Sequence, residues 1–434
     1  MKNLIEVWKG VYHGNPSWLK YEYPTLSGKK CSRTRKTLRA GYMVCSELAS
    51  LLWAEMPDFT ASDYVQSVLN GSAFWDAIKT QSEYMIALGG MALKLYIENS
   101  QVKIDYIPAD RFVPVTWDAS GVSEADFIDR RIEDKKQIVR IERHRIKPGG
   151  YSIESEEYEE IAGERRPTHK EIVKQDVPVK MFVYVKNPMV NNFDLNSAYG
   201  LSLFANSLDT LESLDVAFDA LQSEIVLGRK RIIVPSGAVR FITDPETGKP
   251  IKYFDPADEV FQAFAGDDLE KLKITDNTSE LRIEDIRLAI KTMLELLCIQ
   301  IGFNTGTLSF DGQSMKTATE VISENSKTFK TKKTYEKAIG AGILELINLI
   351  RRVYAWLENA KDTVDPILEW DDSVVEDRNS LASYVHERLQ NNTLELWRAL
   401  MWLDGIEETE ARQRAEELAK SRQVVNFDDI LGGL

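Results

Sequence analysis

The stretch Ile301–Thr331, IGFNTGTLSFDGQSMKTATEVISENSKTFKT, places a short polar loop with three glycines between two helical patterns. Before the loop, apolar residues recur every three or four positions from about Arg282 to Ile301. These residues are Ile283, Ile286, Ile290, Met293 and Leu297. Their spacing predicts an amphipathic helix with one buried face. A second helical pattern runs from about Lys316 to Trp356, so the sequence here predicts a helix, a polar loop and a long helix.

Length and composition indicate a folded protein with more than one packing unit. At 434 residues the chain exceeds the roughly 250–300 residues at which a single hydrophobic core stops growing. Hydrophobic residues make up 43% and charged residues 28%, which argues against disorder of the whole chain. No apolar run approaches the roughly 20 residues that span a bilayer, and we expect no signal peptide or membrane segment. Three cysteines, Cys31, Cys45 and Cys298, lack metal-ligand spacing and fit a reduced cytosolic protein.

The net charge of −14 disfavours tight binding of nucleic acid through its phosphates. Residues 361–434 hold 17 acidic against 8 basic residues, a difference of −9, so most of the excess lies at this end. Near the other end is a basic cluster, which consists of Lys29, Lys30, Arg33, Arg35, Lys36 and Arg39. This cluster fits either a solvated surface that complements a neighbouring subunit or a patch that contacts phosphates or another partner such as the capsid.

The first two hundred residues predict a mixture of helices and strands. Apolar spacing predicts helices over about Arg35–Ala54 and Ser62–Ala87. Short alternating runs separated by turn residues then predict strands within Met91–Asp118. Further strands are expected at Lys136–Ile146 and at 179–185, and the charged stretch 157–171 between them is expected to form an exposed loop or a hairpin end. This half of the chain therefore predicts an α+β fold.

The second half is mainly helical around a β-containing insert. A clean helical pattern covers Asn206–Gly228, with apolar residues at three- and four-residue spacing. Strand and turn residues follow as far as Asn277, before the helix from Arg282. Small residues at 338–342 of the long helix predict a kink or the close approach of another helix. Three short helices are expected after about residue 378.

The order helix, insert, helix, polar loop and long helix resembles the stem, clip, stem and tunnel loop of tailed-phage portal proteins. The residues that carry the resemblance are KTATEV at Lys316–Val321 and SENSKTF directly after Ile322. A second match is an aromatic N-terminal segment before the helix that begins at Arg35. Its residues are Trp8, Tyr12, Trp18, Tyr21 and Tyr23. These features are most similar to portals from siphophages of Gram-positive hosts.

The resemblance implies a predominantly helical α+β portal fold, assembled as a ring, with a wing, stem, clip and crown. It divides the chain into 1–205 (wing), 206–228 (first stem helix), 229–280 (clip), 281–303 (second stem helix), 304–360 (tunnel loop and long wing helix) and 361–434 (helical crown). The strand and turn content of 229–280 would equally suit part of the wing.

The implied function is that of a portal, most often a dodecamer, at one vertex of the capsid. Such a ring is a conduit for double-stranded DNA during packaging and ejection. It docks the large terminase and then a head-tail adaptor protein, and it contacts the major capsid and scaffolding proteins. The implied location is the virion, with assembly in the host cytoplasm, no membrane, no cofactor and no catalytic role.

The resemblance places the loop 304–314 nearest the ring axis. The channel-facing candidates are Asn304, Thr305, Gly306, Asp311, Gly312, Gln313 and Lys316. Candidate DNA-facing cations on the next helix are Lys327, Lys330, Lys332 and Lys333. An acidic ring with few such cations would let duplex DNA slide, because each neutralised phosphate adds affinity. Equally, the glycines can form a simple tight connection while the lysines pair with Glu324 or Glu336 on the helix surface.

A search for catalytic motifs finds none. The sequence lacks a phosphate-binding loop, H-E-x-x-H, G-x-S-x-G and C-x-x-C. Its histidines, His13, His144, His169 and His386, are far apart in sequence, so no metal site is expected. The alternative to a portal is an intracellular α+β enzyme or binding protein with a helical oligomerisation tail.

Overall fold

The computed structural model describes residues 1–24, 28, 30–99, 101–161, 164–168, 173–227, 232–233, 240–243, 248, 250–253, 275–276, 280–309, 318–370, 378–391, 393–404 and 406–418. The chain forms two compact units. The larger unit comprises Met1–Ser17, Arg39–Leu208 and Glu295–Leu434, and the smaller unit comprises Trp18–Leu38 and Asp209–Leu294. Trp18–Leu38 thus belongs with residues almost two hundred positions later, a grouping that the sequence analysis did not anticipate.

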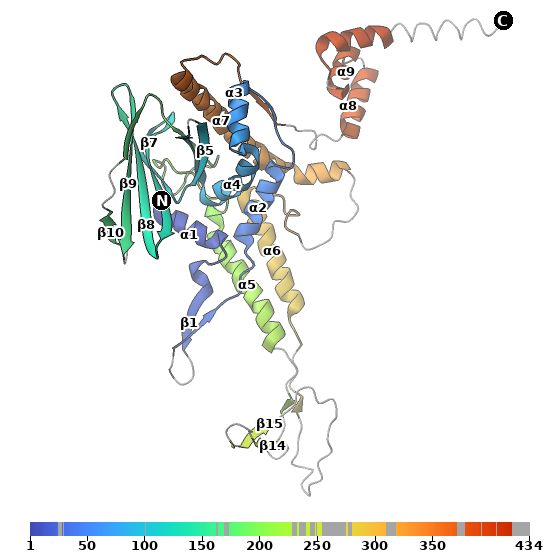
Figure 1. The fold of residues 1–434 in the computed structure, drawn as a ribbon. Coiled ribbons are helices and arrows are strands. Elements are labelled where there is room, and N and C mark those ends of the chain that lie inside the picture. Colours follow the sequence, from blue (N-terminus) through green and yellow to red (C-terminus); the bar gives the residue numbers. More distant parts are fainter. Residues whose placement is uncertain are drawn as a thin grey trace, which may run out of the picture. The chain divides into compact units, whose positions relative to one another are not determined.

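The larger unit begins with four helices, α1 (Lys2–Tyr12), α2 (Ala40–Leu52), α3 (Asp63–Gly71) and α4 (Phe74–Leu88) (Figure 1). The helix predicted from Arg35 begins at Ala40, after Arg39, which has a left-handed φ of 56°. The helix predicted over Ser62–Ala87 is divided into α3 and α4, because Ala73 has a φ of 45°. Both predicted helices are therefore present, with one late start and one internal break.

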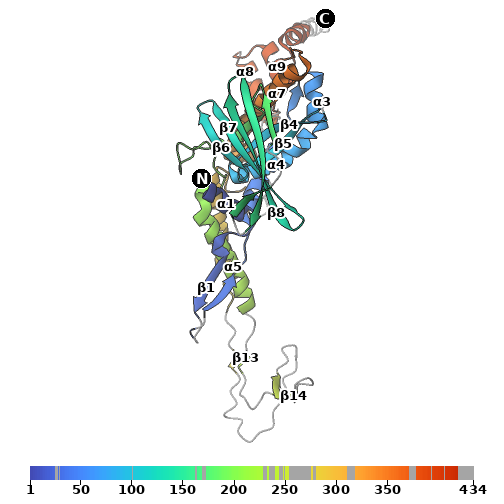
Figure 2. The ribbon, with the colours of Figure 1, turned by 60° about the vertical axis from the view of Figure 1, so that its left-hand side comes forward.

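Two antiparallel sheets follow. The smaller sheet has the order β12-β4-β5 and the larger has the order β10-β9-β8-β7-β6, with β11 also paired with β9. Figure 2 shows β6, β7 and β8 side by side. The strands are β4 (Gly90–Glu98), β5 (Gln101–Pro108), β6 (Phe112–Asp118), β7 (Gly121–Glu133), β8 (Lys136–Lys147), β9 (Gly150–Ile161), β10 (Glu164–Pro167), β11 (Val173–Val177) and β12 (Phe182–Lys186). The predicted α+β character is confirmed. Within 157–171, β9 and β10 pair as a hairpin, which is the hairpin end that was one of the two expectations for this stretch.

Aromatic side chains join the two sheets. Phe112 stacks on Tyr184 with ring centroids 4.4 Å apart, and Phe127 meets Phe182 edge to face at 5.3 Å. Phe112, Phe127 and Phe182 are buried. Burial of large aromatic rings contributes much of the hydrophobic stabilisation of a core, so this cluster fixes how the sheets pack.

The long helix α7 (Ala318–Glu358) packs against β12. A Cβ atom added to Gly342 would lie 2.3 Å from Cγ2 of Val185, so only glycine allows this contact. The small residues predicted a kink or a close helix, and the structure shows a close strand along a helix that continues through them. Another distant pairing joins β17 (Ile367–Glu369) to β3 (Asp58–Thr60).

Three helical segments lie in the predicted crown, α8 (Arg378–Gln390), α9 (Leu396–Asp404) and residues 408–418. Ala399 and Ala411 are buried, and the guanidinium of Arg412 lies 3.9 Å from the ring centroid of Trp397. The three predicted short helices are therefore present, although residues 419–423 of the third lie outside the described residues.

The smaller unit contains β1 (Lys20–Pro24), β2 (Lys30–Thr34), α5 (Leu208–Leu227) and the first part of α6 (Ile283–Ile301). Short 3-10 turns, Ser17–Leu19 and Ala205–Ser207, precede β1 and α5. Figures 1 and 2 both show β1 beside α5. Between α5 and α6, β13 (Ile232–Ile233) pairs with β16 (Thr275–Asp276), and β14 (Arg240–Thr243) pairs with β15 (Pro250–Tyr253). Helices α5, α6 and α7 agree with the predicted ranges to within about two residues.

Candidate functional site

The first candidate site is the junction where α6 ends and the polar loop begins. Gly302 has a left-handed φ of 83°, and the N–H of Phe303 donates to the carbonyl of Cys298 at 2.7 Å. This is the bond of a Schellman cap, which satisfies a carbonyl that the helix leaves unpaired. The side chain of Phe303 is fully buried, so both a hydrogen bond and an apolar contact fix the chain as it leaves α6.

One turn of α7 holds the same junction from the other side. Lys327 donates from Nζ to the carbonyl of Ile299 at 3.0 Å, and Thr331 donates from Oγ1 to the carbonyl of Gly302 at 2.7 Å. The hydroxyl oxygen of Thr328 accepts from the backbone N–H of Asn304 at 2.9 Å. An ammonium group at the C-terminal end of α6 also suits the negative end of the helix dipole. We call Lys327, Thr328 and Thr331 the α7 anchor.

The predicted channel-facing residues divide into two groups. Asn304 is half-buried and held by the α7 anchor, whereas Thr305 and Gly306 are exposed. The hydroxyl of Thr307 lies 3.2 Å from that of Thr328 and extends the contact. The remaining predicted residues, Asp311, Gly312, Gln313 and Lys316, lie outside the described residues.

The predicted cations of α7 also differ in their surroundings. Lys330 and Lys333 are exposed. Lys327 is also exposed, but its Nζ donates a hydrogen bond to the carbonyl of Ile299. Lys332 is only 7% exposed, and its Nζ lies 2.9 Å from Oε1 of Glu336. This is the pairing with Glu336 considered as the alternative, and it turns Lys332 toward the core. The sequence analysis omitted Lys337, which is exposed and lies seven residues, about two helical turns, after Lys330.

A second polar centre lies in the smaller unit, where two buried aspartates of α5 bind the segment 18–38. Asp215 accepts from Nε1 of Trp18 at 2.9 Å, and from the hydroxyl of Thr37 and the N–H of Leu38 at 2.8 and 2.9 Å. We call Asp215 and Asp219 the aspartate clamp. The two residues are 5% and 7% exposed, so the hydrogen bonds compensate for the loss of water.

The other half of the clamp engages the predicted basic cluster. Asp219 lies 3.0 Å from Nη2 of Arg33 and accepts from the N–H of Lys36 at 3.0 Å. Arg35 donates to the carbonyl of Trp18 at 2.9 Å and lies over the ring of Tyr21 at 4.3 Å. Arg33, Arg35 and Lys36 of the basic cluster therefore form contacts within the chain. The sequence has no signal that distinguishes the two aspartates of the clamp, because Asp209 and Glu212 of α5 are also acidic.

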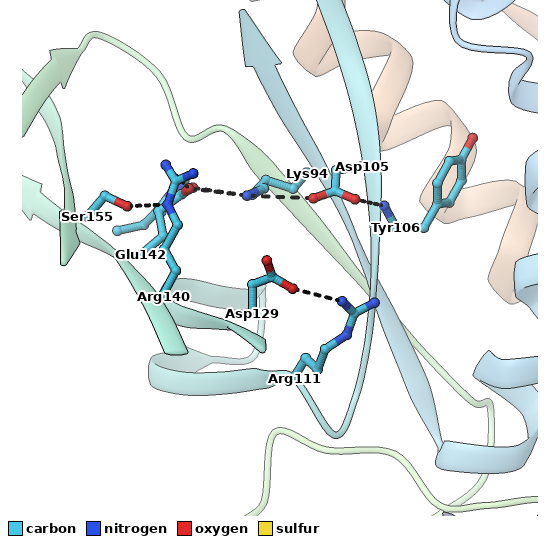
Figure 3. Close-up of polar contacts among 9 residues, drawn as sticks. Lys94, Asp105, Tyr106, Arg111, Asp129, Arg140, Glu142 and Ser155 are labelled. Carbon is cyan, nitrogen blue, oxygen red and sulfur yellow. Dashed lines mark hydrogen bonds and ion pairs between the residues drawn. The ribbon is translucent and has the colours of Figure 1, made fainter. Parts of the chain in front are cut away.

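A third polar centre is a cavity of about 260 Å³ between strands of the two sheets. Figure 3 shows its charged side chains, which form pairs with one another. They are Lys94, Arg111 and Arg140 with Asp105, Asp129 and Glu142. Lys94 of β4 lies 3.2 Å from Glu142 of β8 and 3.8 Å from Asp105. Charges of both signs line the cavity and pair with one another, and the pair between Lys94 and Glu142 joins the two sheets.

Glu142 also binds His144, which is almost fully buried. The two side chains lie 2.8 Å apart, from Nε2 to Oε1. Burial alone would raise the pKa of Glu142, but the hydrogen bond from His144 and the charge of Lys94 lower it to about 2. Burial lowers the pKa of His144 more than its bond to Glu142 raises it. The pair therefore favours neutral histidine beside an ionised carboxylate.

In the described part of the chain, no three His, Cys, Asp or Glu side chains gather closely enough to hold a metal ion. Nor does any helix within the described ranges have the length and apolar character to cross a membrane.

Comparisons with known proteins give one family. Residues 50–424 match the model of the family described as phage portal protein, SPP1 Gp6-like. No curated protein matches the chain. A chain in the solved neck of an empty GTA particle, computed with C6 symmetry, is 11% identical with a TM-score of 0.44, and the match covers 89% of this chain and 93% of that one. A chain in the virion of a native gene transfer agent particle is 12% identical with a TM-score of 0.44 over 93% of each chain.

The assignment rests on the family match, because structural similarities at these TM-scores carry no further weight. The matched residues include α5, α6 and α7, together with both sheets. The matched range therefore includes the junction at the end of α6, both residues of the aspartate clamp and most of the described core. On this basis, the chain belongs to the SPP1 Gp6-like family of phage portal proteins.

Proposed function

We propose that this protein forms a ring at one capsid vertex, through which double-stranded DNA enters during packaging and leaves during ejection. The observation that carries the proposal is the family match over residues 50–424. The ring is a dodecamer in this proposal. It docks the large terminase and later a head-tail adaptor, and it contacts capsid and scaffolding proteins during assembly in the host cytoplasm. A siphophage of a Gram-positive host is the proposed source.

Within the ring, residues 304–314 are the proposed DNA-facing element, with residues 310–314 outside the described part of the chain. The α7 anchor supports this proposal, because it fixes the backbone of Asn304 and leaves Thr305 and Gly306 exposed. A loop that must contact a moving duplex needs a fixed starting point and exposed residues beyond it. The junction has both.

The distribution of charge fits weak contact with DNA. A chain with a net charge of −14 does not accumulate phosphate contacts, and every neutralised phosphate strengthens binding. Lys330 and Lys333 are exposed next to the α7 anchor and keep their proposed role. Lys327 binds the carbonyl of Ile299 and Lys332 binds Glu336 in a buried pair, so we assign these two side chains to the junction and to the core.

Ring formation is tested by negative-stain imaging and mass measurement of the purified protein. We expect rings with a central hole wide enough for duplex DNA. Monomers or dimers at every concentration would overturn the proposal in favour of an enzyme or binding protein with a helical tail.

The role of the loop is tested by deleting residues 305–311, which spares Asn304 and the bond between Phe303 and Cys298. The expected result is normal ring assembly with impaired packaging or retention of DNA. Gly71→Ala on α3 is the control, because it lies outside the loop and an added Cβ there meets nothing within 4 Å. Normal packaging by assembled deletion rings would contradict the assignment of the loop.

A further inference from the structure

The hairpin of β1 and β2 is exposed on both faces. In both strands every residue is exposed or half-buried, and within the described residues the pair joins no further strand. The aspartate clamp binds Trp18 before the hairpin and Arg33, Lys36, Thr37 and Leu38 at its end. An isolated two-stranded hairpin is marginally stable in water. The hairpin is therefore held at its base and has an uncovered surface.

The chemistry of that surface is basic and aromatic. Residues 20–36 contain six basic residues and one acidic residue. Lys20, Lys30 and Lys36 are exposed, and Tyr23 is 42% exposed with its ring 6.1 Å from that of Tyr21. Lysines around tyrosine rings fit a surface that combines carboxylates with apolar side chains.

One face of α6 has this complementary chemistry. Leu281 and Leu288 are 43% and 64% exposed, although both are large apolar residues. Glu284 and Asp285 lie between them and are also exposed, and Glu284 forms an exposed ion pair with Arg287 at 3.0 Å. Glu284, Asp285 and Leu288 are three or four residues apart and therefore share one side of α6, and Leu281 lies two residues before this helix begins. These four residues, which we call the α6 face, combine two exposed leucines with two carboxylates.

The hairpin of the same copy does not cover the α6 face. The aspartate clamp fixes the ends of the hairpin segment to α5, and Leu281 and Leu288 remain exposed while it does so. Two different, complementary surfaces on one chain are the requirement for a heterologous interface, which closes into a ring when the rotation between copies allows it.

We propose that the hairpin of each copy packs on the α6 face of the neighbouring copy, with its lysines beside Glu284 and Asp285 and its tyrosines over the leucines. This inference rests on the proposed ring. A second copy is favoured over nucleic acid because Arg33 and Arg35 are engaged within the chain and the protein is acidic. It also assigns the basic cluster to subunit contact.

Cross-linking through the native Cys31 tests the contact directly. Cys31 lies on β2 and is partly exposed, whereas Cys45 and Cys298 are buried. We would introduce Leu288→Cys and treat assembled rings with a short bis-maleimide. The expected result is a ladder of covalent multimers on a denaturing gel, which Cys31→Ser abolishes. Val173→Cys is the matched control, because Val173 is also 64% exposed but lies on β11.

The outcomes separate this inference from the ring itself. Rings with no ladder, with links only inside one copy, or with an equal ladder from Val173→Cys would overturn the contact and leave the ring standing. Absence of rings would overturn the proposed function. If duplex DNA protected Cys31 of unassembled protein from alkylation and no ladder formed in rings, the hairpin would be a DNA-binding element and the inference would be wrong.

Discussion

The N–H of Phe303 and the carbonyl of Cys298 are joined at 2.7 Å across the end of α6, with Gly302 between them at a φ of 83°. This bond sets the direction in which the chain leaves the helix. It brings Gly302 so close to α7 that the carbonyl of Gly302 accepts the hydroxyl of Thr331.

Gly302→Ala should destabilise the protein by more than about 1 kcal/mol, because the new Cβ meets both a left-handed backbone and a crowded site. That Cβ would lie 2.6 Å from Oγ1 of Thr331. Gly306→Ala, four residues along, should be almost neutral because its space is open. Thermal and urea unfolding of the two variants make the comparison. Equal stability would show that the junction is not fixed at Gly302.

Asp215→Ala should release the segment 18–38 from α5. The substitution removes the acceptor for Trp18, Thr37 and Leu38, which are half-buried, and a donor left unpaired away from water costs up to about 1–3 kcal/mol. We expect faster trypsin cleavage in residues 20–36, which contain six basic residues. Glu212→Ala, an exposed change one turn earlier on α5, is the control. Unchanged cleavage of the Asp215 variant would argue against the clamp.

Lys332→Ala and Lys330→Ala should have opposite consequences. Loss of Lys332 leaves Glu336, which is 3% exposed, without its partner, and breaking a buried pair costs about 3–5 kcal/mol. Lys330 is exposed, so its loss should change stability by less than about 0.5 kcal/mol. Unfolding curves measure both changes in stability. DNA packaging by assembled rings tests the proposed DNA-facing role of Lys330. A stable Lys332 variant would contradict the assignment of this side chain to the core.

Acid should destabilise the larger unit through His144 and Glu142. Both groups have folded pKa values below their ordinary ones, so the unfolded chain binds more protons. The free energy of unfolding therefore decreases as the pH is lowered. The loss begins below the ordinary pKa of His144, 6.5, and for Glu142 it extends from 4.5 down to about 2. The contribution of Glu142 is on the order of 3 kcal/mol.

Thermal unfolding between about pH 7 and pH 3 measures this dependence. Glu142→Gln should flatten the slope in the acidic part of the range, because glutamine does not titrate. Glu98→Gln, at an exposed ion pair with Lys103, is the control. Parallel curves for wild type and Glu142→Gln would exclude this carboxylate as the source of acid sensitivity.

Features that depend on local periodicity could be predicted from the sequence. The apolar spacing of α5, α6 and α7 survives in the structure because each helix buries one face, for example through Leu214 and Leu297. Strands β7 and β9 were not predicted, because charged residues interrupt the alternation of apolar and polar residues that indicates a strand. Glu156 of β9 is an example, since it pairs with Arg143 of the neighbouring strand β8 at 2.6 Å.

Features that depend on distant partners could not be predicted. Lys330 and Lys332 look alike in the sequence, and only the packing around α7 buries one and exposes the other. Asp215 looked like a surface position of an amphipathic helix until Trp18 and Leu38 supplied its hydrogen bonds. For the candidate site, the sequence located the loop and its glycines, but the α7 anchor required the three-dimensional arrangement.

The aspartate clamp also imposes an order of events during synthesis. Trp18 and Asp215 are 197 residues apart, and translation at about 5–20 residues per second separates their synthesis by roughly 10–40 s. During this interval the nascent hairpin has two open edges and no α5 on which to dock. Conditions that slow elongation lengthen this delay, so yield of soluble protein should respond to them more strongly than the stability of the finished fold would suggest.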